Sequence, residues 1–403
     1  MKLIFVSAVC SREKYAYIFN RRNQKFIDPA QKFLEQLMRG VASDEINDVV
    51  SISSLPVSSS TIDQKLFKLE EEEKDKIRYI YPRFFNGKFS RYITTFISTF
   101  WAVRRQLRIN NGNNTVIITD PLSYQTSMAA RLAGKLTKTK CIAIITDIPT
   151  YATGMKNHGY KKIRQMFQTI YERLTLKELY KYDAYINLTK DMDEIVNPRK
   201  KPSIVIEGSV DSQIAPVKDL NQTDKKVFLY AGGLYEKYGV GNLVQAFINA
   251  RLENVQLHLY GSGSYVKRLM QICDINNNVI YKGCVLNTEL IEIERNADLL
   301  INPRFSNENY TKYSFPSKTL EYMTTGTPVL STKLSGIPEE YKDYLLWFDG
   351  ETVGDMQKRL NEVSKISNSD MYKIGKKAQE FVLSNKTNVI QGKRIVEFVM
   401  QIV

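Results

Sequence analysis

The densest group of side chains suited to chemistry lies in one polar stretch between two apolar strand candidates, residues 297–301 and 329–331. This stretch contains the cations Arg304 and Lys318 and the carboxylate of Glu321. Ligands of open α/β sheets bind beyond the carboxyl ends of the strands. We therefore expect these three side chains to meet a ligand rather than to form a structural turn.

A short helix is expected inside this stretch, because Ser314 is a suitable N-cap and Pro316 suits a first turn. Gly326 and Pro328 then end the helix. The unpaired N–H groups and the dipole of a helix N-terminus both favour negative charge. With Arg304 in the same loop, the pattern predicts a binding site for a nucleotide diphosphate.

Two further loops follow strand candidates in the second half of the chain. Gly232 and Gly233 allow a close approach of backbone, and Lys237 adds a positive charge. Gly261 and Gly263 allow a second close approach. Each pattern alone is common in turns, but three such loops at one predicted sheet edge favour an anionic ligand.

Strand and helix candidates alternate through both halves of the chain. This order predicts an α/β fold with two Rossmann-like, doubly wound domains that face each other across a cleft. The expected boundaries are residues 1–208 for the first domain, 209–225 for a hinge, 226–385 for the second domain and 386–403 for a closing helix. The closing helix is a candidate to return to the first domain.

The first half lacks a glycine loop that could bind phosphate. The turn after its first strand, residues 7–12, contains no glycine, which argues against a dinucleotide site there. Asp147 follows the strand candidate 141–146 at the edge where ligands bind, and it could equally cap its own loop. The acidic patch 70–73 is expected to be a solvated surface.

Almost all the excess of positive over negative charge lies in the first half. Residues 1–210 carry 34 Lys and Arg against 21 Asp and Glu, which gives +13 of the net charge of +14. Such a surface favours a membrane face, a phospholipid-like substrate or nucleic acid, and a solubilising surface is the alternative.

Residues 91–105 predict an amphipathic helix on the sheet whose basic edge suits lipid headgroups. No nucleic-acid recognition motif is present, so we expect no nucleic acid partner.

The chain has few residues that could bind a metal ion or form a nucleophilic triad. The four cysteines form no CxxC pair and the two histidines are His158 and His258, so metal clusters and hydrolase triads are not expected. No run of about 18 apolar residues is present, and the chain opens directly on a strand candidate. We therefore expect a cytoplasmic protein.

Four segments of the second half carry a family resemblance. They are 232–239 (GGLYEKYG), 259–263 (LYGSG), 281–285 (YKGCV) and 313–329 (YSFPSKTLEYMTTGTPV). Together they resemble the donor half of retaining GT-B glycosyltransferases of family 4. The tract 308–321 resembles in particular the members that build bacterial capsule, exopolysaccharide and O-antigen.

The resemblance implies a nucleotide sugar whose diphosphate lies over the amides of residues 314–318. Lys237 would contact phosphate, Glu321 would accept the ribose hydroxyls, and the base would lie near residues 260–263. With Asp147, added for its place at a strand end, Lys237 and Glu321 form the expected catalytic set. The donor-binding residues implied are Gly233, Lys237, Tyr260, Gly261, Gly263, Val285, Arg304, Glu308, Tyr313, Ser314, Phe315, Pro316, Ser317, Lys318 and Glu321.

The resemblance also implies a mechanism without metal or other cofactor. The helix dipole and the cations would take the charge that Mg²⁺ neutralises elsewhere. The departing phosphate would help to deprotonate the acceptor on the same face of the sugar, so no protein nucleophile is needed.

Two positions depart from the family pattern. Tyr313 stands where relatives carry the first Glu of a paired motif that contacts the donor sugar, so Tyr313 or the nearby Glu308 would take that role. The Arg that often precedes the phosphate-binding Lys is absent at Gly233, and Arg304 is the best substitute.

The basic first half favours an acceptor at an anionic membrane. Family members that build polymers act on saccharides carried by polyprenyl diphosphate, so we expect a peripheral enzyme at the inner face of the cell membrane that moves a hexose from a UDP-sugar. The alternative is a catalytically silent GT-B subunit that binds and regulates a partner glycosyltransferase, which Tyr313 motivates.

Overall fold

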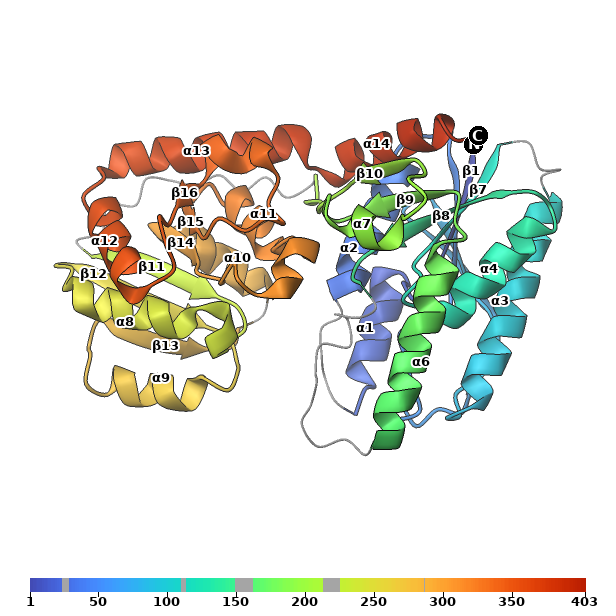
Figure 1. The fold of residues 1–403 in the computed structure, drawn as a ribbon, viewed down its shortest axis with the longest axis horizontal. Helices are drawn as coiled ribbons and strands as arrows, with labels where there is room; N and C mark the ends of the chain where they lie inside the picture. The colour runs from blue at the N-terminus through green and yellow to red at the C-terminus, as the bar shows by residue number, and fades with distance from the viewer. Residues whose placement is uncertain (24–28, 110–113, 149–161, 213–224, 286) are drawn as a thin grey trace. The chain divides into compact units, whose positions relative to one another are not determined.

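The computed structural model describes residues 1–403 except 24–28, 110–113, 149–161, 213–224 and 286 (Figure 1). Contacts divide the chain into two compact units. The first comprises Met1–Ser209 and Asn388–Val403, and the second comprises Val210–Thr387. The predicted hinge, 209–225, lies largely outside the described residues.

An eight-stranded sheet forms the centre of the first unit, in the order β10-β9-β8-β7-β1-β2-β5-β4. All neighbouring strands in it are parallel except β4, which runs antiparallel to β5. The strands are β1 Lys2–Ser7, β2 Asp48–Ser53, β4 Glu70–Lys74, β5 Ile77–Tyr81, β7 Thr115–Thr119, β8 Lys140–Ile145, β9 Ala184–Asn187 and β10 Ser203–Val205. A separate antiparallel pair joins β3 Leu66–Phe67 to β6 Phe84–Phe85.

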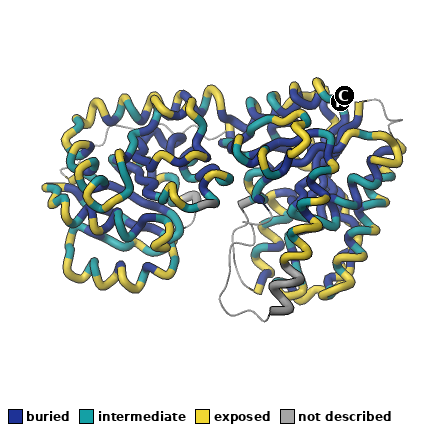
Figure 2. The backbone as a smooth tube through the Cα atoms, viewed as in Figure 1, coloured by how far each residue is buried: buried dark blue, intermediate teal, exposed yellow. Residues whose placement is uncertain are grey.

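Helices cover this sheet because its central strands are apolar on both faces, as is typical of parallel strands. All six residues of β1 and all five of β7 are buried (Figure 2). The helices are α1 Arg12–Asn20, α2 Pro29–Ala42, α3 Ser90–Ile109, α4 Tyr124–Lys135, α6 Lys162–Leu179, α7 Met192–Val196 and α14 Asn388–Met400.

The last helix, α14, packs on α2 of the first unit. Two glycines permit this contact, because a Cβ on Gly40 would lie 1.7 Å from the carbonyl oxygen of Asn388 and one on Gly392 would lie 2.2 Å from the carbonyl carbon of Gly40. Gln391 also donates to the carbonyl oxygen of Gly208 at 2.9 Å. The C-terminal segment is therefore part of the core of the first unit.

The acidic patch is a strand as well as a surface. Residues 70–74 form the edge strand β4, which is mostly exposed and pairs with β5 through a tight turn. Both turn residues, Asp75 and Lys76, have positive φ (52° and 60°), a conformation that hairpin turns require and that glycine or asparagine usually provides. Because neither residue type is present at the turn, the hairpin carries no recognisable signal in the sequence.

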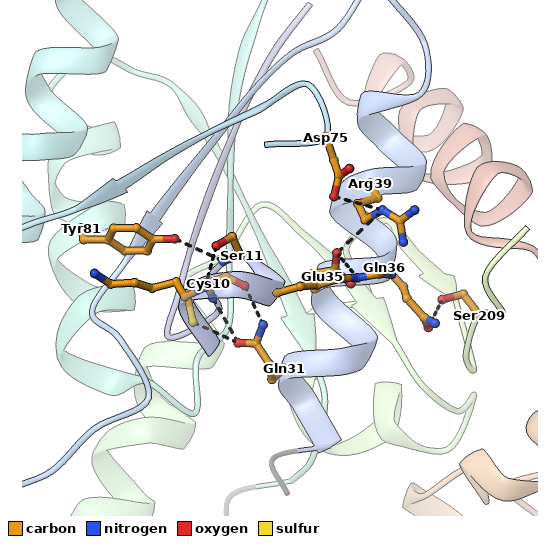
Figure 3. Close-up of polar contacts among 11 residues, drawn as sticks. Cys10, Ser11, Gln31, Glu35, Gln36, Arg39, Asp75, Tyr81 and Ser209 are labelled. Carbon is orange, nitrogen blue, oxygen red and sulfur yellow. Dashed lines mark hydrogen bonds and ion pairs between the residues drawn. The ribbon is translucent and has the colours of Figure 1, made fainter. Parts of the chain in front are cut away.

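The glycine-free turn after β1 is held by side chains (Figure 3). The backbone N–H of Cys10 donates to Gln31 Oε1 at 3.1 Å, and Gln31 Nε2 donates to the carbonyl oxygen of Cys10 at 2.6 Å. The N–H of Ser11 donates to the hydroxyl of Tyr81 at 3.2 Å. Backbone groups that would face a phosphate in a glycine loop are thus bound to protein side chains here.

A six-stranded, all-parallel sheet forms the centre of the second unit, in the order β13-β12-β11-β14-β15-β16. The strands are β11 Lys226–Ala231, β12 Val255–Tyr260, β13 Val279–Gly283, β14 Leu299–Asn302, β15 Val329–Ser331 and β16 Leu346–Trp347. The helices are η1 Glu236–Tyr238, α8 Val240–Ala250, α9 Val266–Cys273, α10 Asn287–Asn296, η2 Asn309–Tyr313, α11 Ser317–Thr324, η3 Glu339–Tyr344, α12 Val353–Ser364 and α13 Asn368–Asn385.

Both faces of this sheet are covered, since successive residues of a strand point to opposite sides. Phe228 of β11 belongs to one buried cluster with α8, α9 and α12, whereas Leu229 belongs to another with α11 and α13. This is the doubly wound α/β architecture that the sequence predicts, and it brings the loops after β11, β12, β13 and β14 to one edge.

Candidate functional site

Backbone hydrogen bonds join three loops at the carboxyl edge of the second sheet. The N–H of Gly232 donates to the carbonyl oxygen of Tyr260 at 3.0 Å, and the N–H of Leu234 donates to that of Ser262 at 2.9 Å. The N–H of Gly261 donates to the carbonyl oxygen of Gly283 at 2.8 Å. The predicted convergence of the loops after β11 and β12 is therefore present as a hydrogen-bonded layer, and the loop after β13 also belongs to it.

Glycine is required in this layer because the loops touch backbone to backbone. Gly261 has φ +129°, and a Cβ there would lie 1.9 Å from the carbonyl oxygen of Gly232. A Cβ on Gly263 would lie 2.1 Å from the carbonyl oxygen of Leu234. A Cβ on Gly233 would press on the rings of Tyr235 and Tyr238, at 3.0 and 2.9 Å. These glycines shape the edge, and their predicted contact with a donor remains a prediction.

Lys237 and Arg304 meet at the ring of Tyr238. Gly239, at φ +75°, passes so close to Pro303 that a Cβ would lie 1.9 Å from its carbonyl oxygen, which joins the Lys237 loop to the loop of Arg304. Lys237 Nζ lies 5.2 Å and Arg304 Cζ 5.0 Å from the centre of the Tyr238 ring, within the range of cation–π contact. Within the part of the chain that the structure describes, neither side chain forms an ion pair with a carboxylate.

Helix α11 is fixed by its buried face. The hydroxyl of Tyr322 donates to the carbonyl oxygen of Ala231 at 3.0 Å and accepts from the N–H of the same residue at 2.9 Å, so α11 is attached to the end of β11. Asn302 donates to Thr319 Oγ1 at 3.3 Å and attaches the helix to β14. Glu321, on the opposite face, remains partly exposed, with 17% of its side chain accessible.

The start of α11 corrects the sequence prediction. The helix begins at Ser317 with Pro316 as its N-cap, and Ser314 is extended (φ −139°, ψ 121°) at the end of η2. A residue that precedes proline is kept out of the helical region, so Phe315 cannot belong to a first turn that starts at Ser314. The N–H groups exposed at this helix end are accordingly those of Ser317 and Lys318, because the N–H of Thr319 already donates to the carbonyl oxygen of Pro316 at 2.8 Å.

Lys318 lies between two carboxylates. Its Nζ is 2.7 Å from Glu321 Oε1 and 3.3 Å from Glu294 Oε1 of α10, and the Glu294 side chain is fully buried. Burial alone would lower the pKa of Lys318, but the charges and hydrogen bonds of Glu321 and Glu294 outweigh it and raise the pKa above its ordinary value. Lys318 is therefore protonated and compensated, which distinguishes it from Lys237 and Arg304.

Sequence reasoning missed Glu294. A single glutamate in the sequence gives no sign that it is buried, and only the fold brings Glu294 of α10 to Lys318 of α11. The sequence also could not show which of its cations are already paired.

The remaining predicted donor residues follow two patterns. Glu308 is the N-cap of the short helix η2 and Tyr313 is its last residue, and both are half-buried. Phe315 and Tyr260 are buried in the core of the unit, where Phe315 packs on Tyr341 with ring centres 5.6 Å apart. Val285 is half-buried beyond β13. Direct contact with a donor by these residues remains a prediction.

Asp147 lies in the first unit, at the end of β8. Its Oδ1 accepts from the N–H of Ile148 at 2.8 Å, which is the loop-capping arrangement considered from the sequence. Burial raises the pKa of Asp147, and this hydrogen bond opposes the shift. Its catalytic role remains a prediction.

Potential metal ligands are dispersed. Among the residues that the structure describes, no three His, Cys, Asp or Glu side chains gather in a group that could hold a metal ion.

Comparisons with known proteins find a family similarity in the second unit. Residues 211–381, nearly all of that unit, match the family model for glycosyl transferases group 1. No curated protein matches the chain.

Solved structures share the fold of the whole chain. Sucrose-phosphate synthase from Thermosynechococcus elongatus aligns with a TM-score of 0.65 at 14% identity, over 100% of this chain and 99% of that one. The lipopolysaccharide outer core galactosyltransferase WaaB gives 0.63 at 16%, over 100% of both chains. HepE from Anabaena in complex with UDP gives 0.61 at 13%, also over 100% of both. The chain is therefore a glycosyltransferase of GT-B fold, and its second unit is similar to the group 1 glycosyl transferases.

Proposed function

We propose that this protein transfers a hexose from a UDP-sugar, with retention of configuration, to a lipid-linked saccharide in the synthesis of a bacterial surface polysaccharide. The observation that carries the proposal is the position of two cations, Lys237 and Arg304. Their loops contact each other, and both side chains lie against the ring of Tyr238. A diphosphate is the natural partner for two neighbouring cations that no carboxylate of the described residues compensates.

The diphosphate would bind between this pair and the free amides at the start of α11. Its negative charge grows when the sugar–phosphate bond breaks, and fixed cations and helix amides stabilise that charge without reorganisation. This set of groups supports a reaction that needs no metal or other cofactor. Glu321, at the first turns of the same helix, would accept the ribose hydroxyls.

UDP is favoured as the carrier by two of the structural neighbours. HepE from Anabaena was solved with UDP, and also with UDP and glucose. In this chain the base would lie near Tyr260 and Val285, and the sugar near Tyr313 or Glu308.

Retention follows if acceptor and leaving group use one face of the sugar. The bond from the anomeric carbon to the β-phosphate oxygen breaks, and a bond from the same carbon to the acceptor oxygen forms. The acceptor proton passes to the departing phosphate, so the reaction balances without a protein nucleophile. Asp147 is the candidate in the first unit to orient the acceptor hydroxyl.

The exposed face of α3 supports an acceptor at a membrane. Three large apolar side chains recur at every fourth residue of α3 and form one stripe: Ile93, Ile97 and Trp101. Phe89 precedes the helix at the same spacing, and each of the four side chains is at least half exposed. Arg105 and Arg108 continue the helix with positive charge. No helix in the described residues is long and apolar enough to cross a bilayer. An apolar stripe next to basic residues suits a peripheral position on anionic lipid.

The donor site is tested by binding and by activity. UDP and UDP-hexoses should raise the melting temperature of the wild type by mass action. Lys237→Ala and Arg304→Ala should each lower donor turnover about 100-fold, the usual loss when one group that stabilises developing charge is removed. Lys267→Ala, an exposed lysine of α9, is the matched control and should keep full turnover. No thermal shift with any uridine or guanosine diphosphate would contradict the donor assignment.

The same experiments separate an enzyme from a silent subunit. Glu321→Ala should reduce hydrolysis of the donor, whereas a subunit without activity has none to lose. For the membrane part of the proposal, flotation with vesicles should increase with the fraction of anionic lipid. Flotation that does not respond to that fraction would remove the membrane from the proposal and leave the donor site intact.

A further inference from the structure

The buried carboxylate of Glu294 lies one side chain away from the candidate ribose ligand. None of the Glu294 side chain is exposed, and its Oε1 is 3.3 Å from Lys318 Nζ. The same Nζ lies 2.7 Å from Glu321 Oε1. The three side chains thus form a row from the interior of α10, through Lys318, to the partly exposed Glu321.

Glu294 belongs to a rigid part of the second unit. The hydroxyl of Thr327, itself buried, donates to the carbonyl oxygen of Glu294 at 3.0 Å, so the end of α10 is attached to the turn before β15. Thr327 Oγ1 also lies 3.2 Å from the carbonyl oxygen of Arg295. The carboxylate therefore starts from a fixed backbone position.

Stability gives little reason for a charge at this position. A buried ion pair loses so much hydration that replacing it with apolar side chains is often neutral or favourable. A Lys–Glu pair three residues apart on one helix is weak on its own and does not fix either long side chain. A second carboxylate from another helix changes this, because Lys318 then has partners on two sides.

We propose that Glu294 is a positioning residue that acts through Lys318 to hold Glu321 in the orientation that receives the ribose hydroxyls. The inference rests on the proposed function, because it assumes that a nucleotide binds at α11. It assigns Lys318 to the ribose side of the site and leaves the diphosphate to Lys237 and Arg304.

The test measures whether Glu294 and the ribose hydroxyls are coupled. Binding of UDP and of 2′,3′-dideoxy-UDP is compared by calorimetry in the wild type and in Glu294→Gln, which keeps the side-chain volume and removes the charge. We expect Glu294→Gln to weaken UDP about tenfold and to leave dideoxy-UDP unchanged, a coupling of the size found between interacting groups. A merely structural role would weaken both nucleotides equally.

Glu292→Gln is the matched control. Glu292 lies on the same helix, is exposed and pairs with the nearby Arg295 at 2.9 Å, so the Glu292→Gln variant should bind both nucleotides as the wild type does. Lys318→Met should show the same selective loss as Glu294→Gln, and the double variant should lose no more than Lys318→Met alone. Lys318→Met also tests the inference if Glu294→Gln fails to fold.

The possible outcomes distinguish a failure of the role of Glu294 from a failure of the proposed function. Equal losses for both nucleotides, no loss, or additive losses in the double variant would overturn the role of Glu294 while the donor site stands. Failure of the wild type to bind UDP would overturn the proposed function, and the inference with it.

Discussion

Both units are built on a sheet of mainly parallel strands, yet the loops at the end of their first strands are held in different ways. In the first unit, Gln31 and Tyr81 bind the backbone groups of Cys10 and Ser11 with their side chains (Figure 3). In the second unit, the loop after β11 hydrogen-bonds to the neighbouring loop through backbone groups, and Gly261 makes the contact possible.

The cations near these loops also differ between the two units in the partners that they contact. In the first unit, Arg12 and Arg39 both approach the buried Glu35, at 3.1 and 3.8 Å, and Arg39 also lies 3.4 Å from Asp75. In the second unit, Lys237 and Arg304 share an aromatic ring instead of a carboxylate. Cations at a strand end can bind an anion more readily where the protein's own carboxylates do not already neutralise them, and among the described residues Lys237 and Arg304 meet that condition.

The largest effect should come from breaking the backbone contact of the second unit. Gly261→Ala places a Cβ 1.9 Å from the carbonyl oxygen of Gly232 at φ +129°, so backbone must move. We expect a loss of about 3–5 kcal/mol in the free energy of unfolding, from strain and overpacking together. Denaturant unfolding measures this loss of stability, and a UDP-binding assay accompanies it.

Gly283→Ala is the control for that variant. Gly283 also has positive φ, +75°, but a Cβ there would meet nothing within 4 Å. The expected cost is only about 1–2 kcal/mol, the penalty of the left-handed conformation. Equal costs for the two variants would show that conformation rather than loop contact explains the glycines, and the comparison between the units would lose its basis.

A smaller effect is expected from removing the hydrogen bonds between Gln31 and Cys10 in the first unit. Gln31→Leu removes both hydrogen bonds to Cys10 inside a buried site, and we expect a loss of about 1–3 kcal/mol. UDP affinity should stay unchanged, because the nucleotide is proposed to bind the other unit. Gln64→Leu, an exposed glutamine, should leave stability unchanged. A fall in UDP affinity with Gln31→Leu at unchanged stability would contradict the division of roles.

Local signals explain which parts of this fold the sequence could predict. Strand β15 occupies residues 329–331, where the sequence places it, because a short apolar run is a local signal. The family motifs likewise identify the loops of the second unit from adjacent residues. The architecture of two doubly wound units follows from the order of these elements.

Tertiary distances explain what the sequence could not predict. Gln31 is 21 positions from Cys10, and Glu294 is 24 positions from Lys318, so neither contact has a local signature. The start of α11 was misplaced because the effect of Pro316 on its preceding residue competed with a good N-cap at Ser314. Which cations are free for a ligand depends on such distant contacts, and composition shows only their number.

The smallest expected effect is a change in the pH dependence of stability, and it sharpens the contrast in charge. Burial raises the pKa of Glu35, while Arg12 and Arg39 oppose the shift. The folded state therefore holds this proton to higher pH than the unfolded state, so this carboxyl makes stability fall as pH rises above the usual range of glutamate. Glu35→Gln cannot titrate and should flatten the decline in melting temperature across that window. Glu45→Gln, a fully exposed acid whose pKa is lowered by Lys76, should not flatten it. The expectation would be contradicted if the wild-type melting temperature rose through this window and Glu35→Gln left the slope unchanged. The arginines would then hold Glu35 ionised, and the carboxylate would neutralise the cations of the first unit more fully.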